Sequence, residues 1–211
     1  MNAIRSHIVC IIDRSGSMQP ISGDAIGGYN SFLEKQSQLP GEAVVTLVLF
    51  DHEYSRVCWA HPLDKAPLLD AGSYIPRGST ALLDAIGRTI DDVREIGTVP
   101  PGFRTQTEAD KVIVVILTDG MENASRNYSQ ADIAQRIDKM RQEYGWEFVY
   151  LGANQDAISV ARSMNISTET SASFEHSREG MRAACAMMDE QVMYSRSFLR
   201  TADDDAAGSK Q

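Results

Sequence analysis

The sequence is poor in cysteine. It has three among 211 residues, and no short spacing relates Cys10, Cys58 and Cys185. Two of them fall inside predicted strands and one falls inside a predicted helix, where a thiol behaves as a small hydrophobic group. We therefore expect reduced cysteines and a cytoplasmic protein.

The sequence also lacks a basic run and a long apolar segment. Its 20 Lys and Arg residues are outnumbered by 29 Asp and Glu residues, which gives a net charge of -9. Electrostatic attraction to phosphate backbones is thus disfavoured, and no nucleic-acid partner is expected. Only five consecutive apolar residues precede Asp13, too few for a signal peptide, and no stretch approaches the roughly 20 residues that cross a bilayer. We expect neither secretion nor a membrane partner.

A polar loop directly follows the first apolar run of the sequence. Residues 8–12 are mostly β-branched and predict a buried parallel strand, and the segment Asp13-Arg14-Ser15-Gly16-Ser17 comes next. In open α/β sheets, ligands bind at the carboxyl ends of the strands. One carboxylate and two hydroxyls, spaced two residues apart, can converge on one small ion if the loop curls, and oxygen ligands suit Mg²⁺ or Mn²⁺.

Two later stretches supply further oxygen-bearing side chains. Thr80 follows Gly78-Ser79 and precedes a helical pattern, and Asp119 follows an apolar strand predicted over residues 112–117. Both lie where an element begins or ends, and loops at such places are exposed and can gather around one point.

These residues in this order resemble the metal-ion-dependent adhesion site (MIDAS) of von Willebrand factor type A (vWA) domains. That family has an Asp-x-Ser-x-Ser loop, then a lone Thr, then an Asp commonly followed by Gly. The resemblance covers roughly residues 7–199. It implies a Mg²⁺ site, with Mn²⁺ or Ca²⁺ as alternatives, whose open position is filled by an Asp or Glu of a protein partner. The implied metal ligands are Asp13, Ser15, Ser17, Thr80 and Asp119.

The order of apolar segments predicts the fold class. A length of 211 residues fits one large domain. Strand patterns alternate with helical patterns, which indicates a Rossmann-like, doubly wound, mostly parallel α/β sheet with helices on both faces. One antiparallel edge strand is expected at about residues 55–60. We expect a single vWA domain over residues 1–199 and a disordered, acidic and polar tail over residues 200–211.

Several residues allow two interpretations. Gly27-Gly28, inside a helical pattern, indicates either close packing of that helix on the sheet or a hinge beside the metal loop. Asp51 is either a turn former or a residue that supports the metal ligands. Asp84 either orients the Thr80 hydroxyl or a metal-bound water, or is a solvated helix acid.

The last helix, predicted over residues 177–199, has an apolar stripe that includes Met181 and Met188. Such a stripe either docks on the protein's own sheet or offers a groove to a partner. Two other segments have simple interpretations. Residues 97–110 indicate a flexible connector, and Asn154 is typical of a helix N-cap.

We expect a non-enzymatic, monomeric protein-binding module. A nucleophilic Ser15 would need a base, yet no histidine lies beside the loop in the sequence. A Mg²⁺-dependent phosphohydrolase is an alternative, but aspartyl-phosphate phosphatases typically carry a second acid where this chain has Ser15. A metal-independent scaffold that acts through the last helix is another alternative.

Overall fold

Six strands form one sheet in the computed structural model, which describes residues 5–96, 111–153 and 156–208. Their order in the sheet is β3-β2-β1-β4-β5-β6, and every neighbouring pair is parallel except β2 and β3. This arrangement confirms the doubly wound sheet with an antiparallel edge strand that the sequence predicts. The strands are β1 (Arg5–Asp13), β2 (Glu42–Phe50), β3 (Tyr54–Pro62), β4 (Lys111–Thr118), β5 (Glu147–Gly152) and β6 (Ser171–Ser173).

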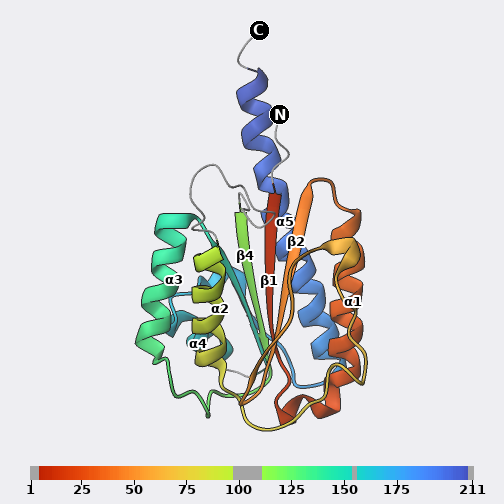
Figure 1. Ribbon diagram of the computed structural model, residues 1–211, viewed down its shortest axis with the longest axis vertical. Helices are drawn as coiled ribbons and strands as arrows, with labels where there is room; N and C mark the ends of the chain where they lie inside the picture. Colours follow the sequence, from red (N-terminus) through yellow and green to blue (C-terminus); the bar gives the residue numbers. More distant parts are fainter. Residues whose placement is uncertain (1–4, 97–110, 154–155, 209–211) are drawn as a thin grey trace.

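The central strand β1 is buried on both sides. Ile8 pairs in register with Val45 of β2 and Ile113 of β4, and none of these three side chains is exposed. A strand covered on both faces needs apolar residues at every position, which explains its continuous β-branched run. Because β1, β2 and β4 are parallel, their carboxyl ends lie at one edge of the sheet, the lower edge in Figure 1.

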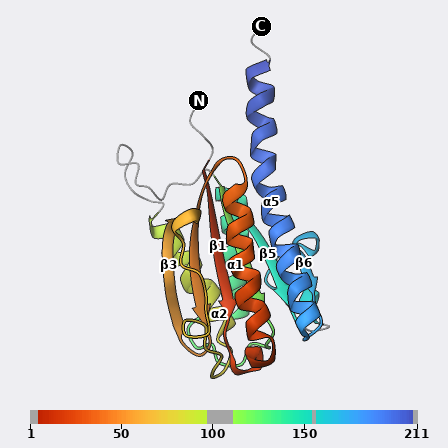
Figure 2. The same cartoon turned by 90° about the vertical axis from the view of Figure 1, so that its right-hand side faces the viewer.

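Helices cover the two faces of this sheet (Figures 1 and 2). On one face, Phe32 of α1 and Met188 of α5 belong to the same buried cluster. On the other face, Ile86 of α2 and Ile137 of α3 belong to a second buried cluster. The helices are α1 (Ser22–Gln38), α2 (Leu82–Ile96), α3 (Gln130–Tyr144), α4 (Ala157–Ser163) and α5 (Arg178–Gly208), with short 3-10 helices η1 (Gly16–Ile21), η2 (Leu63–Lys65) and η3 (Thr168–Thr170).

The apolar stripe of α5 is part of the core, because Met181, Cys185 and Met188 are buried in one cluster with residues of α1 and the sheet. Docking on the protein's own sheet is therefore confirmed. A Cβ on Gly28 would lie 2.2 Å from Cys185 Sγ, whereas a Cβ on Gly27 would meet nothing within 4 Å. Close packing thus explains Gly28 alone, and its neighbour is α5 rather than the sheet.

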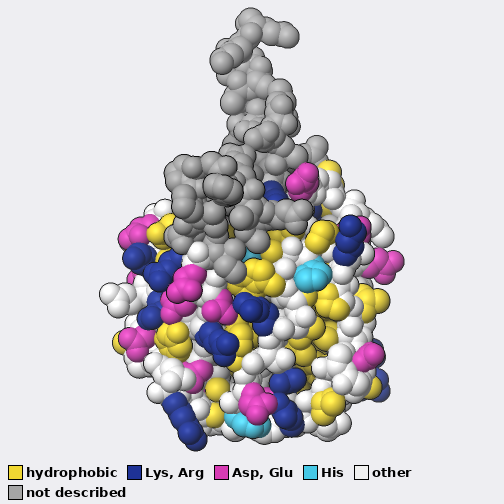
Figure 3. Space-filling view, in the orientation of Figure 1, with side chains coloured by type: hydrophobic (Ala, Val, Ile, Leu, Met, Phe, Trp, Pro, Cys, Tyr) yellow, Lys and Arg dark blue, Asp and Glu magenta, His cyan; other side chains and the backbone are white. Residues whose placement is uncertain are grey.

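Cys10, Cys58 and Cys185 are buried and form no disulfide. In the described ranges, no helix is long and apolar enough to cross a membrane. On the face shown in Figure 3, acidic and basic side chains are interspersed and form no continuous basic area.

Three sequence predictions concern segments that lie partly or wholly outside the described residues. Helix α5 continues to Gly208, past the boundary expected at residue 199, and the division into a domain and a tail stays a prediction. The expected connector at residues 97–110 and the expected N-cap at Asn154 lie outside the described residues.

Candidate metal centre

The loop after β1 curls around the carboxylate of Asp13. This residue ends the strand, is fully buried, and accepts a hydrogen bond on Oδ1 from the Ser15 backbone N–H at 2.6 Å. Two backbone bonds fasten the loop to its surroundings, one from Arg14 N–H to the Phe50 carbonyl and one from Gly16 N–H to the carbonyl of residue 78. The loop therefore takes the curled form on which a shared ion site depends.

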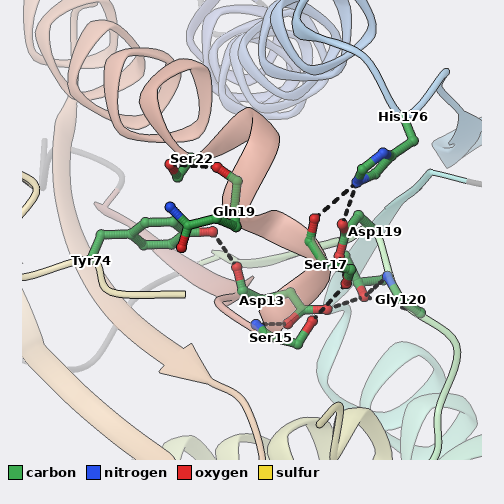
Figure 4. A network of polar contacts seen from close by, with 10 residues as sticks. Asp13, Ser15, Ser17, Gln19, Ser22, Tyr74, Asp119, Gly120 and His176 are labelled. Carbon is green, nitrogen blue, oxygen red and sulfur yellow. Dashed lines mark hydrogen bonds and ion pairs between the residues drawn. The ribbon is translucent and has the colours of Figure 1, made fainter. Parts of the chain in front are cut away.

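The loop after β4 meets this first loop through side-chain hydrogen bonds (Figure 4). The Ser17 hydroxyl donates to Asp119 Oδ1 at 2.7 Å, and the hydroxyl oxygens of Ser15 and Ser17 are 3.1 Å apart. The Thr118 hydroxyl donates to Asp13 Oδ2 at 2.6 Å. Both acids thus belong to one network, although they lie in separate loops.

Thr80 reaches the same place from the segment before α2. Its backbone N–H donates to Asn123 Oδ1 at 2.9 Å, and the Asn123 N–H donates to the Thr80 carbonyl at 3.0 Å. A Cβ on Gly120 would lie 2.7 Å from Thr80 Oγ1. It would also lie 3.5 Å from both Asp13 Oδ2 and Ser15 Oγ, so oxygen donors surround the space that this glycine leaves free.

This donor set fits a small, hard cation. Every side chain offers oxygen, and neighbouring oxygens around a Mg²⁺ ion at about 2.1 Å lie about 3 Å apart. The separations of 2.7 Å and 3.1 Å in the network are close to that value. Burial raises the pKa of Asp13 to about 6; hydrogen bonds from Thr118 and Ser15 oppose the rise, and the charge of Asp119 adds to it. A divalent cation would favour the ionised form of both carboxylates.

The structure therefore brings together all five residues that the sequence singles out, and their role as metal ligands stays a prediction. Among the described residues, no group of three or more His, Cys, Asp and Glu side chains is arranged to hold a metal ion. The candidate site is instead a mixed set of hydroxyls and carboxylates, which the contacts described above bring together.

Two further residues lie at this centre, and the sequence does not predict a role there for either. His176, between β6 and α5, places Nε2 2.7 Å from Asp119 Oδ2 and 3.1 Å from the Ser17 carbonyl oxygen (Figure 4). The buried Tyr74 donates its hydroxyl to the Asp13 carbonyl. No histidine lies beside the metal loop in the sequence, and no pattern there marks either residue; the fold alone brings both to this edge of the sheet.

Asp51 forms a turn and also joins two arginines. Its Oδ1 accepts from the Glu53 backbone N–H at 2.7 Å, as a turn-forming Asp does. Its Oδ2 accepts from Arg14 Nε and Arg77 Nε, each at 3.0 Å. The side chain is fully buried, so these two ion pairs offset the cost of burying its charge. Asp51 thus supports the metal loop through Arg14, the residue that follows Asp13.

Asp84 fits neither of the two interpretations given above. Its carboxylate accepts hydrogen bonds from the backbone N–H groups of Arg126, Asn127 and Tyr128, at 2.9–3.0 Å. It therefore fastens the segment that leads from the metal centre into α3. The sequence could not show this role because the donors lie more than 40 positions away.

No family model and no curated protein matches the chain. Solved structures do match it. Proximal thread matrix protein 1 from the mussel byssus, with a zinc-occupied MIDAS motif, is 11% identical at a TM-score of 0.61, covering 90% of this chain and 48% of that one. A von Willebrand factor type A structure from Catenulispora acidiphila is 15% identical at a TM-score of 0.57, covering 90% and 43%. The vWF domain of the type V pili tip protein Mfa5 from Porphyromonas gingivalis is 12% identical at a TM-score of 0.60, covering 92% and 97%.

These likenesses show that the chain has the vWA fold. It spans less than half of the mussel and Catenulispora chains and nearly the whole of the Mfa5 domain. A solved structure with this fold holds a divalent metal at its MIDAS. At these identities the likeness concerns the fold, and the activity of this chain is inferred from its own residues.

Proposed function

We propose that the chain is a vWA-type protein-interaction domain, in which a divalent cation joins it to a carboxylate of a protein partner. The convergence of two carboxylates and three hydroxyls at the carboxyl edge of the sheet carries this proposal. The zinc-occupied MIDAS of the mussel protein supports it. The residues that would hold the cation are Asp13, Ser15, Ser17, Thr80 and Asp119.

The charge of the donor set explains why a partner acid would bind. Asp13 and Asp119 bring one negative charge each and the hydroxyls bring none, so the protein only balances the charge of the ion. Mg²⁺ prefers six oxygen ligands and keeps waters where the protein supplies few anions. When bound, the cation supplies an electrophilic position that an Asp or Glu of the partner can take. Mn²⁺ and Ca²⁺ accept the same oxygen donors and are the alternatives.

The arrangement favours binding over catalysis. A serine nucleophile is activated by a base within hydrogen-bond reach of its hydroxyl. His176 contacts the backbone carbonyl of Ser17 rather than its hydroxyl, so this histidine activates neither serine. The Ser17 hydroxyl donates to Asp119, but both side chains are ligands of the cation in the proposed site. We accordingly propose a non-enzymatic module. We also propose that it is monomeric and cytoplasmic, with neither nucleic acid nor membrane as a partner.

Calorimetric titration of the metal-stripped protein with Mg²⁺ tests the site. We expect one-to-one binding that is lost in Asp119→Ala and Ser15→Ala, while both variants melt cooperatively in chelator. Asp64→Ala and Ser31→Ala are the matched controls, because both residues are exposed and lie outside the metal loops. Wild-type affinity in Asp119→Ala would contradict the assignment of the ligands.

The binding of a carboxylate at the open position of the cation is tested with Mn²⁺ as a paramagnetic probe and acetate as the carboxylate. Bound Mn²⁺ enhances the relaxation of water protons as long as water remains in its coordination shell. Acetate that takes the open position should lower this enhancement. If saturating acetate has no effect on Mn²⁺-loaded protein, the adhesion role is wrong, and a metal-independent scaffold becomes the better explanation.

A further inference from the structure

His176 connects two loops of the metal centre from a third segment of the chain. Its Nε2 lies 2.7 Å from Asp119 Oδ2, in the loop after β4, and 3.1 Å from the Ser17 carbonyl, in the loop after β1. In Figure 4, Asp119 lies between the imidazole and Asp13. The imidazole is therefore placed outside the group of oxygens that would surround a cation.

The two neighbours of Nε2 determine where its proton is. A backbone carbonyl and an ionised carboxylate only accept hydrogen bonds, so Nε2 carries the hydrogen and donates to both. A ring nitrogen that carries hydrogen has no lone pair for a metal ion. His176 therefore acts on the metal centre through Asp119 and not as a ligand.

Each carboxylate oxygen of Asp119 has its own donor. The Ser17 hydroxyl donates to Oδ1 and His176 donates to Oδ2. The Asp119 side chain is fully buried, whereas the His176 side chain is 39% exposed. Two donors on separate segments fix the orientation of this carboxylate before a cation arrives. A side chain that is already ordered loses less conformational freedom when the ion binds.

We propose that His176 is a positioning residue of the metal centre, one that orients Asp119 and sets its spacing from the Ser17 loop. This inference rests on the proposed function, because it requires a cation among the five predicted ligands. It extends the site to the segment between β6 and α5, which carries none of those ligands.

Calorimetry with Mg²⁺ and with Zn²⁺ on matched variants tests this role. His176→Ala should weaken the binding of both ions by the same factor, about 10- to 100-fold, as the loss of an outer hydrogen-bond partner does. His176→Gln keeps an N–H donor and should recover most of the lost affinity. His61→Ala is the control, because His61 is also exposed but bonds to Trp59 in β3.

The outcomes separate this inference from the proposed function. Melting in chelator should be alike for wild type and His176→Ala, because the imidazole contributes little to the core. If wild type binds Mg²⁺ and His176→Ala binds it equally well, the inference fails and the metal site stands. A loss confined to Zn²⁺ would identify a direct ligand and would also overturn the positioning role. If wild type binds neither ion, the proposed function fails and the inference fails with it.

Discussion

At the scale of single residues, burial shifts the pKa values of two ionisable groups in β1, Asp13 and His7. Burial raises the pKa of Asp13 and lowers that of His7, because the charged form is the one that burial disfavours in both cases. The two buried groups differ in their polar partners. Asp13 faces hydroxyls that a cation could join, whereas neutral His7 bonds to the Thr46 hydroxyl at 2.8 Å.

His7 should make stability depend on pH. Burial, and next the charge of Arg5, lower its pKa from 6.5 to about 4, so the folded state binds the proton less tightly than the unfolded state. The stability that neutral His7 contributes is present above pH 6.5 and is lost as the pH falls through 4. The difference corresponds to about 3 kcal/mol.

Urea unfolding of His7→Gln at several pH values checks this expectation. Between pH values of about 7.5 and 4, the free energy of unfolding should fall by about 3 kcal/mol less in the variant than in wild type. Carboxylates titrate in both proteins, so their contribution to the pH dependence of the free energy of unfolding cancels in this comparison. An equal fall in the two proteins would show that His7 is not the group responsible.

At the scale of elements, the adjacent glycines of α1 differ in their surroundings. A Cβ on Gly28 would lie 2.2 Å from Cys185 Sγ and 2.8 Å from Cys185 Cβ, whereas Gly27 has open space. Helix α5 therefore approaches α1 at a distance that only glycine permits at position 28.

Alanine at the two positions should change stability in opposite directions. Gly28→Ala should lower the free energy of unfolding by about 1–3 kcal/mol, because the added methyl group overpacks the contact with Cys185. Gly27→Ala should raise it by about 0.5–1 kcal/mol, because alanine loses less backbone entropy in a helix. Urea denaturation measures both. Equal stabilisation by the two variants would mean that α5 does not pack this closely.

At the scale of the whole molecule, α5 completes the core on one face of the sheet. Met181, Met188 and Val192 are fully buried there, together with Phe32 of α1. Without α5, this face would be exposed to water over a large apolar area.

Two truncations test this dependence. A chain that ends at residue 177 should lose cooperative thermal unfolding, because it lacks the apolar stripe of α5. A chain that ends at residue 199 should keep the melting temperature and the Mg²⁺ affinity of the full chain, as the predicted domain boundary requires. Cooperative unfolding of the shorter chain, or a marked loss of stability in the longer one, would contradict these expectations.

The sequence by itself determined the elements and the composition of the candidate site. Runs of β-branched residues predicted the central strands, because a strand between two helical layers is apolar on both sides. Parallel strands end at one edge, so the acid that ends β1 and the acid that follows β4 are expected near each other, and Asp13 and Asp119 do share a hydrogen-bond network. These inferences need only local patterns and the rules of sheet topology.

Only the tertiary structure decided which side chains support that site. His176 contacts Asp119 across 57 positions, Asp84 holds residues 126–128, and Gly28 fits against Cys185. Hydrophobic periodicity reports which side of an element faces the core, but not which loop returns to which edge of the sheet. That depends on the lengths and packing of the helices between the loops, so polar contacts over long separations have no local signature in the sequence.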